Sequence, residues 1–203
     1  EAAGVEAAVK YKNRKDMALV YSTAPCKVAG TFTTNVVKAA PVLWDKKVVE
    51  TSAFAQAVVV NSGIANACTG KPGMDCCKAE AEHAGNLLGI PADAVLVAST
   101  GVIGMQMPVD RLCAGIDKLV AAKEATLEAG LDAAKAIMTT DTVHKQIAVS
   151  FELNGKTVTV GGMCKGSGMI HPNMCTMLGF VTADVNIPKE MFQKAVSASV
   201  EDS

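Results

Sequence analysis

The sequence has 203 residues, of which 50% are hydrophobic, 19% are charged and 4% are aromatic, and its formal net charge is −1. A soluble domain contains about 25% charged residues, so this chain is apolar and lightly charged. The composition argues against disorder, which needs low hydrophobicity and high net charge, and against nucleic-acid binding, which needs a basic surplus. No uncharged apolar run approaches the roughly 18 residues of a membrane span, so we expect no membrane partner.

Strands and helices alternate in the first half of the chain. Residues 17–22 predict a strand, and residues 31–33 a further short one. The β-branched run at residues 57–61 is typical of a buried strand. Apolar residues at three- and four-residue steps then predict a helix over residues 74–88, which Gly89 ends.

The pattern continues with a strand at residues 94–98 and a helix that Pro108 opens, at a position where the missing N–H has no helical partner to lose. A further helix is expected over residues 124–138. Alternating apolar residues on both sides of Asn154-Gly155 then predict a β-hairpin.

A glycine-rich loop over residues 161–168, a strand over residues 177–185 and a helix after Pro188 complete the predicted elements. Mixed strands and helices with a hairpin predict a layered domain of the α/β or α+β type. The residue patterns alone leave both classes open.

The seven cysteines are odd in number and include no CxxC pair, and the three histidines have no metal-ligand spacing. We therefore expect reduced thiols, no disulfide scaffold and no metal site. Without a visible targeting segment, the unpaired cysteines favour a cytoplasmic protein. The chain starts at Glu1 and stops at Ser203 inside a polar helical stretch, so we expect a processed or partial chain.

Three segments carry polar residues beside predicted elements. Residues 61–70 follow a buried strand with small residues and glycines, which suits either close approach to a ligand or a tight crossover. Thr100 and Gly101 follow the next strand, where a hydroxyl and a backbone N–H suit an oxyanion, although a structural turn fits equally. Residues 138–142 offer three hydroxyls and a carboxylate, for a polar substrate or for capping and turning the chain.

A fourth segment contains the glycine-rich loop. It is not a nucleotide-binding loop, because Lys165 precedes the Gly-Ser-Gly sequence instead of closing it, and no GxSxG elbow is present. A hydroxyl residue in a strained glycine-rich loop can instead attack the preceding carbonyl and become a new N-terminal nucleophile. Its own α-amine, with a pKa of about 7.7–8.0, then serves as the base. Thr176, after Cys175, is the candidate.

This fourth segment, GGMCKGSGMIHPNMCTMLGF, closely resembles the self-cleavage region of the ornithine acetyltransferases, the glutamate N-acetyltransferases of arginine biosynthesis. Other segments match the same family in the same order, through essentially the whole chain: residues 31–35 with 40–42, 61–70, 99–104 and 138–142. The resemblance implies the ornithine acetyltransferase fold, which is of the α/β class with layered mixed sheets and helices. This fold is similar to that of N-terminal-nucleophile enzymes of the DmpA type.

The resemblance also implies a function. The precursor would cut itself between Cys175 and Thr176, so that residues 1–175 form an α-chain domain and residues 176–203 begin a β chain. Thr176 would be the nucleophile that takes acetyl from N2-acetylornithine and passes it to glutamate through an acetyl-threonine. The protein's own β chain would be the partner, in an α2β2 heterotetramer. No metal or cofactor is implied, and acetyl-CoA is a further candidate substrate.

Site residues follow from the same resemblance. Thr100 and Gly101 match the oxyanion hole, while Thr139, Lys165 and Thr176 match substrate-binding residues. Two usual alanine positions hold cysteine here, Cys164 and Cys175; both residues are small, so we expect cleavage to survive.

The family's β chain continues past Ser203 and adds substrate-site residues, so the site held here is expected to be incomplete. Two alternatives remain. An N-terminal-nucleophile amidase or aminopeptidase of related fold would share Thr176 but release its product to water. An inactive fragment is the non-enzyme alternative.

Overall fold

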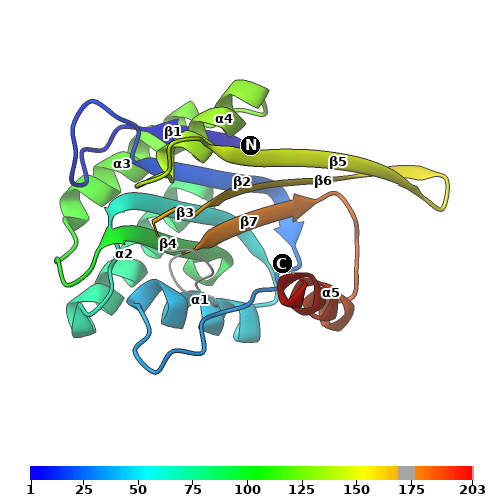
Figure 1. Cartoon of the computed structure of the whole chain (residues 1–203), viewed down its shortest axis with the longest axis horizontal. Helices are drawn as coiled ribbons and strands as arrows, with labels where there is room; N and C mark the ends of the chain where they lie inside the picture. The colour runs from blue at the N-terminus through cyan, green and yellow to red at the C-terminus, as the bar shows by residue number, and fades with distance from the viewer. Residues whose placement is uncertain (169–176, 203) are drawn as a thin grey trace.

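The computed structural model describes residues 1–168 and 177–202, which fold into two β-sheets with helices packed mainly against the first (Figure 1). The strands are β1 (Ala2–Val5), β2 (Met17–Cys26), β3 (Ala55–Ile64), β4 (Val95–Val102), β5 (Lys145–Leu153), β6 (Lys156–Lys165) and β7 (Leu178–Ala183). The helices are α1 (Ala40–Thr51), α2 (Gly70–Leu88), α3 (Val109–Ala122), α4 (Leu127–Ala136) and α5 (Lys189–Glu201), and η1 (Ala92–Ala94) is a short 3-10 turn.

The first sheet has the strand order β1-β2-β3-β4. Its β1–β2 and β2–β3 pairs are antiparallel, whereas β3 and β4 run parallel and are joined through α2. A parallel pair needs such a crossover connection, because its strands start at the same edge. The second sheet, β5-β6-β7, is antiparallel throughout. The expected layered arrangement of mixed sheets and helices is therefore confirmed.

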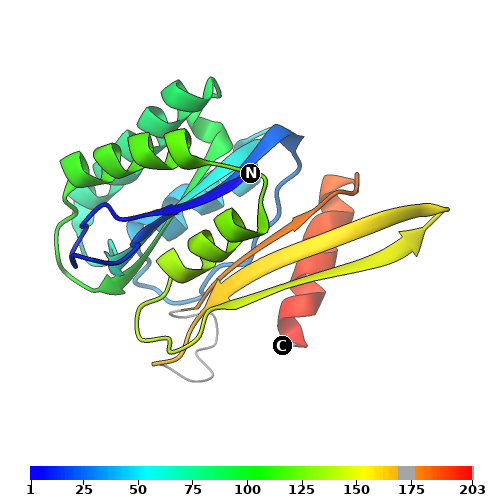
Figure 2. The same ribbon diagram turned by 90° about the horizontal axis from the view of Figure 1, so that it is seen from above.

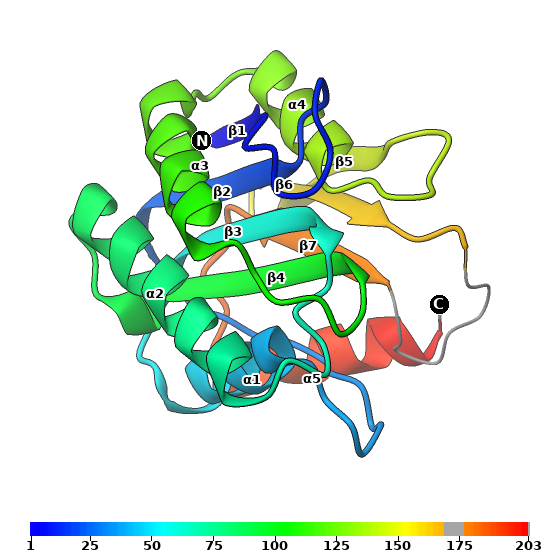
Figure 3. The ribbon, with the colours of Figure 1, turned by 90° about the vertical axis from the view of Figure 1, so that its left-hand side faces the viewer.

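Alternating side chains give the first sheet two buried faces. One face packs on α2 and α3, which Figure 3 shows in front of the sheet; its core includes Leu19, Val59, Val97, Ala81, Leu112 and Ile116. The other face packs on α4 and on the second sheet, and its core includes Ala18, Val60, Ala98, Ala133, Ile137 and Met163. This second core consists mainly of small side chains, so α4 and β6 approach the first sheet closely.

The predicted hairpin is confirmed. Asn154 and Gly155 have φ values of 52° and 72°, which are the two positive values that a tight primed turn requires. The hairpin projects well beyond the rest of the molecule (Figures 1 and 2). The apolar residues that alternate along β5 stay exposed, from Ile147 at 73% to Leu153 at 44%. Their alternation predicts that this face of β5 is buried, but none of the described residues covers it.

Several predicted elements need correction. Residues 31–33 form no strand, and the sequence patterns do not predict β1 or α1. The glycine-rich segment 161–168 is not wholly a loop, because residues 161–165 form the last part of β6. Gly162 fits a strand because its missing Cβ leaves room for the backbone of β7, where the Phe180 carbonyl oxygen would lie 3.2 Å from an added Cβ.

No helix in the described part of the chain has the length and apolarity needed to cross a membrane. The cysteines that the structure describes are free: Cys26, Cys68, Cys76, Cys77, Cys113 and Cys164. Within residues 1–168 and 177–202, no group of His, Cys, Asp and Glu side chains is placed to hold a metal ion.

One carboxyl group of α2 lies in the core. Glu80 is fully buried, and its Oε1 accepts a hydrogen bond from the Cys76 thiol at 3.3 Å, while Oε2 has no partner among the described residues. Burial raises the pKa of Glu80 to about 7. The nearby Asp45 of α1 has its pKa raised by burial to about 8, although the Val97 N–H donates to it. The core therefore favours neutral carboxyl groups at these positions.

We predict that Glu80→Gln changes how stability depends on pH. In the unfolded chain Glu80 ionises near its ordinary pKa of 4.5, but in the folded protein only near 7. The stability that it contributes is therefore present below pH 4.5 and lost as the pH rises to about 7. The amide stays neutral, so the free energy of unfolding of the variant should gain about 3 kcal/mol relative to wild type between pH 4 and 8.

Denaturant unfolding of the full-length protein across this pH range would measure the change. Glu82→Gln, at an exposed position of the same helix, is the matched control for removing a carboxylate from α2. A difference between Glu80→Gln and wild type that stays constant with pH would contradict the prediction.

A second prediction concerns the contact of β1 with α4. A Cβ added at Gly4 would collide with the backbone carbonyl of Asp132, which a packed helix cannot move away. Gly4→Ala should therefore lower the free energy of unfolding by about 1–3 kcal/mol. Gly130→Ala, in the open on α4, is the control and should raise it by about 0.5–1 kcal/mol, because alanine is the better helix former. Equal effects of the two substitutions in thermal or denaturant unfolding would contradict this.

Candidate active site

The site begins at the carboxyl ends of the parallel strands β3 and β4, where ligands commonly bind in open sheets. Thr100 pairs with Ser62 and Gly101 with Gly63 across these strands. Both glycines have positive φ, 136° for Gly101 and 110° for Gly63, and a Cβ on Gly101 would collide with the Gly63 carbonyl. Glycine is required there because the two backbones touch, and this fixes the position of Thr100 beside them.

The end of α4 is tied to the same edge of the sheet. The buried Ser62 hydroxyl donates to the carbonyl oxygen of Ala136 at 2.7 Å, which satisfies one of the carbonyls left unpaired at a helix C-terminus. Arg14 donates from Nη2 to the Met138 carbonyl oxygen at 2.5 Å. These two contacts bring the polar segment 138–142 to the ends of β3 and β4.

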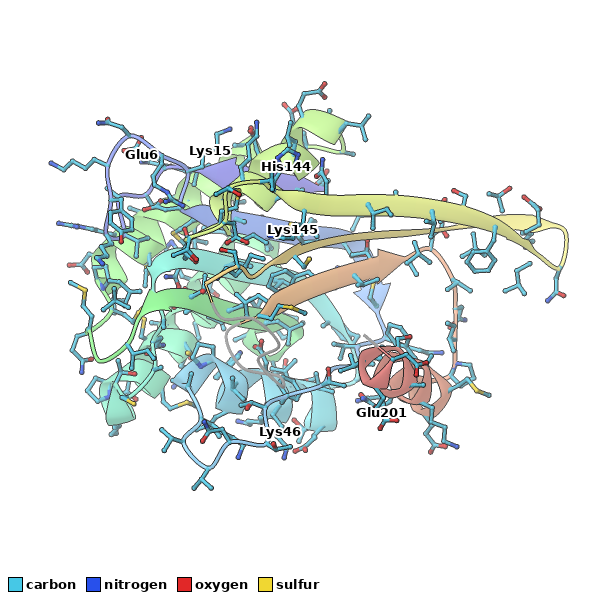
Figure 4. The ribbon with its side chains drawn as sticks, viewed as in Figure 1. Glu6, Lys15, Lys46, His144, Lys145 and Glu201 are labelled. Carbon is cyan, nitrogen blue, oxygen red and sulfur yellow. The ribbon has the colours of Figure 1, made fainter. Side chains whose placement is uncertain are left out.

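Asp141 anchors this segment. Its carboxylate is buried and accepts hydrogen bonds from the Thr139 N–H at 3.2 Å, the Gly166 N–H at 2.8 Å and the Lys145 ammonium at 2.8 Å. Figure 4 labels Lys145, at the start of β5. Burial by itself raises the pKa of Asp141, but the hydrogen bonds from Lys145, Gly166 and Thr139 outweigh it and lower the pKa to about 2. Asp141 is therefore ionised at neutral pH.

Lys165 completes the site from the end of β6. It is only 5% exposed, and its ammonium donates to Oγ1 of Thr100 at 3.2 Å and lies 4.0 Å from the Asp141 carboxylate. The pKa of Lys165 is lowered overall. Burial is the main cause and Lys145 adds to it, while the Asp141 carboxylate acts in the opposite direction. With two lysines around one carboxylate, the site keeps a surplus positive charge, which suits an anionic group of a ligand.

The structure brings together four of the residues expected from the sequence: Thr100, Gly101, Thr139 and Lys165. Cys175 and Thr176, expected at the cleavage site, lie outside the described residues. Cys164 lies beside Lys165 on β6 and is paired with Lys145 of β5.

Segment 61–70 divides between the site, which holds Ser62 and Gly63, and the start of α2. The polar side chains of residues 66–69 serve the start of α2: Asn66 donates to the Gly73 carbonyl at 3.0 Å and accepts from Thr69 at 2.7 Å. For residues 66–69 these contacts fit the structural interpretation. Residues 32–34 line a cavity of about 980 Å³ together with residues of α1 and α5, and Asp141 is not part of its lining.

Three residues of the site were not identified from the sequence. Asp141 and Ser62 were noted within segments 138–142 and 61–70 but not as site residues, and Lys145 gave no usable signal. The four-residue spacing of Asp141 and Lys145 signals an ion pair only on a helix, whereas here Asp141 precedes a strand. Their roles depend on which elements pack together.

The sequence is similar to those of known proteins over its whole length. The model of the ArgJ family matches residues 1–203. The chain is 49% identical to "Arginine biosynthesis bifunctional protein ArgJ 1" of Clostridium acetobutylicum, over 100% of this chain and 49% of that protein. It is 52% identical to the ArgJ bifunctional protein of Symbiobacterium thermophilum, over 94% of this chain and 46% of that protein. The chain thus spans about half the length of the curated relatives it matches.

Two solved structures are similar to the fold. The ArgJ bifunctional protein of Bacillus halodurans superposes with a TM-score of 0.81 at 44% identity, covering 87% of this chain and 90% of that one. The ornithine acetyltransferase of Mycobacterium tuberculosis, solved in complex with ornithine, has a TM-score of 0.76 at 42% identity, covering 87% of this chain and 91% of that one.

We predict that Asp141→Asn removes a source of acid sensitivity. The folded-state pKa of about 2 lies below the ordinary value of 3.8, so the stability that this carboxylate contributes is present above pH 3.8 and lost as the pH falls to about 2. The advantage of wild type over the variant should shrink by about 2 kcal/mol between pH 5 and 2. Asp132→Asn, which removes the exposed partner of Lys15, is the control. An advantage that persists at pH 2 in denaturant unfolding would contradict the prediction.

Proposed function

The chain belongs to the ArgJ family, and from this membership we propose that its protein transfers an acetyl group from N2-acetylornithine to glutamate. The observation that carries the proposal is the contact of Lys165 with Thr100. It joins a residue matched to substrate binding with one matched to the oxyanion hole, from strands in different sheets. The names of the relatives, which refer to arginine biosynthesis and ornithine acetyltransferase, support the same substrates.

The proposed reaction begins with self-cleavage. The Thr176 hydroxyl attacks the carbonyl carbon of Cys175, the peptide bond shifts to an ester, and water hydrolyses that ester. Residues 1–175 then form an α chain, and a β chain begins with residues 176–203. The α-amine released on Thr176, with an ordinary pKa of about 7.7–8.0, can take the proton of the neighbouring hydroxyl near neutral pH.

Acetyl transfer then occurs in two steps. Thr176 Oγ1 attacks the acetyl carbonyl of N2-acetylornithine, the C–N bond breaks, and the ornithine amine leaves with a proton. The amine of glutamate next attacks the acetyl-threonine ester and regenerates the hydroxyl. In both steps the carbonyl oxygen becomes an oxyanion, for which the Thr100 hydroxyl and the Gly101 N–H are the proposed donors. Removing one such donor typically lowers kcat by about 10²–10³-fold.

Substrate binding is assigned to Thr139, Lys165 and Thr176. A surplus positive charge around Asp141 favours the carboxylates that both amino-acid substrates carry. The proposed steps use neither a metal nor an organic cofactor. Acetyl-CoA remains a proposed second acetyl donor, in line with the word "bifunctional" in the relatives' names. An α2β2 assembly and a cytoplasmic location complete the proposal.

We predict that Thr176→Ala in the full-length protein abolishes both cleavage and acetyl transfer, because it removes the hydroxyl that both reactions need. Mass spectrometry should find a fragment that begins at residue 176 in wild type and none in the variant. An assay for acetylglutamate, formed from acetylornithine and glutamate, measures the transfer. Thr176→Ser should retain both reactions.

Thr182→Ala, at an exposed threonine of β7, is the matched control and should be cleaved normally. Hydrolysis of acetylornithine without acetylglutamate would contradict the transferase and favour the amidase alternative. Failure of wild type to cleave or to act on acetylornithine would favour the inactive fragment.

A further inference from the structure

The contact between Lys165 and Thr100 has a defined direction. An ammonium group has hydrogens to donate and no lone pair, so Oγ1 of Thr100 is the acceptor of the 3.2 Å hydrogen bond. A threonine hydroxyl has a single hydrogen of its own, and this hydrogen therefore points away from Lys165. It remains to be donated to another acceptor.

The surroundings strengthen this hydrogen bond. Lys165 and Thr100 are 5% and 8% exposed, and hydrogen bonds are electrostatically stronger in such buried surroundings than in water. A hydroxyl that accepts from an ammonium group also becomes a better donor, because hydrogen bonds in a chain polarise one another. Lys165 thus affects both where the Thr100 hydrogen points and how strongly it binds an anion.

Asp141 keeps this ammonium group in place. Its carboxylate lies 4.0 Å from Lys165 Nζ and also binds the N–H of Gly166, the next residue along the chain. It therefore fixes the backbone at the end of β6 and supplies the charge that favours protonated Lys165. Among the described residues, Asp141 and Lys145 are the charged groups that act on Lys165.

We propose that Lys165 is a positioning residue that orients and polarises the Thr100 hydroxyl toward the developing oxyanion, and that Asp141 holds Lys165 in the required place and charge state. This inference rests on the acetyl transfer proposed above. No proton leaves Lys165 in this role: the Thr100 hydroxyl donates a hydrogen bond to the oxyanion. When the C–N or ester bond breaks, the oxyanion's electron pair re-forms the carbonyl double bond and the leaving group departs with the bonding pair and a proton. Lys165 then contributes mainly to the transition state, beyond any contact with a substrate carboxylate.

A double-mutant cycle in the full-length protein tests the first part. Thr100→Val removes the hydroxyl at nearly constant volume and should lower kcat by about 10²–10³-fold. Lys165→Met should lower kcat at least 10-fold in the wild-type background, but less than threefold further in the Thr100→Val background. Losses that multiply, or a higher KM for Lys165→Met at unchanged kcat, would overturn the positioning role and leave Lys165 as a substrate ligand.

Two controls separate function from folding. Thr100→Ser keeps the hydroxyl and should retain kcat within about tenfold of wild type, since only the methyl group is lost. Circular dichroism should give the same spectrum for all variants. If Thr100→Ser lost as much activity as Thr100→Val, the hydroxyl would not be the group through which Lys165 acts, and the inference would be wrong.

The pH profile of kcat tests the role of Asp141. Activity that needs protonated Lys165 falls at high pH, as the ammonium loses its proton. Asp141→Asn removes the charge that raises the pKa of Lys165, so this alkaline limb should move to lower pH. Lys145→Met removes a positive charge that lowers the pKa of Lys165, so the alkaline limb should not move to lower pH. A limb that stays in place in Asp141→Asn would overturn the role of Asp141.

The outcomes also separate this inference from the function on which it rests. A wild-type protein without acetyl transfer would overturn both. An active wild type in which the losses of Thr100→Val and Lys165→Met multiply would overturn only the positioning role of Lys165.

Discussion

The buried carboxylate of Asp141 is the interaction on which the site depends. An ionised group out of water is stable only if hydrogen bonds and opposite charge replace its hydration. Here the donors come from its own loop, from β5 and from the end of β6. The hydrogen bonds to this one carboxylate therefore hold three segments together. The same arrangement places Lys165 within hydrogen-bond distance of Thr100.

Small side chains make this convergence sterically possible. The core between the first sheet, α4 and β6 is built largely from alanine and valine, so the helix and the second sheet approach the strands more closely than large residues would allow. The hydrogen bond from Ser62 to the carbonyl of Ala136 then aligns the end of α4 with the ends of β3 and β4. Packing and polar contacts act in the same direction, which is typical of a well-specified fold.

Local patterns were enough for much of the fold. The periodicity of α2 and the apolar runs of β3 and β4 identified those elements, and the turn chemistry of Asn154-Gly155 identified the hairpin. Where an element was missed, the signal was weak: β1 has four residues, too few to show a period. The alternation along β5 predicted a buried face that the described residues leave exposed. An alternating pattern indicates that one face of a strand packs against something, but it does not identify what packs there.

The sequence by itself determined the family, the layered class and the residue types of the site, because long motifs and local periodicity are properties of neighbouring residues. Only the tertiary structure decided how those residues work together. Thr100 and Lys165 are separated by 65 positions along the chain, and their contact follows from the packing of two sheets and one helix. The direction of their hydrogen bond, and the carboxylate of Asp141 behind it, depend on distances and burial that no local pattern encodes.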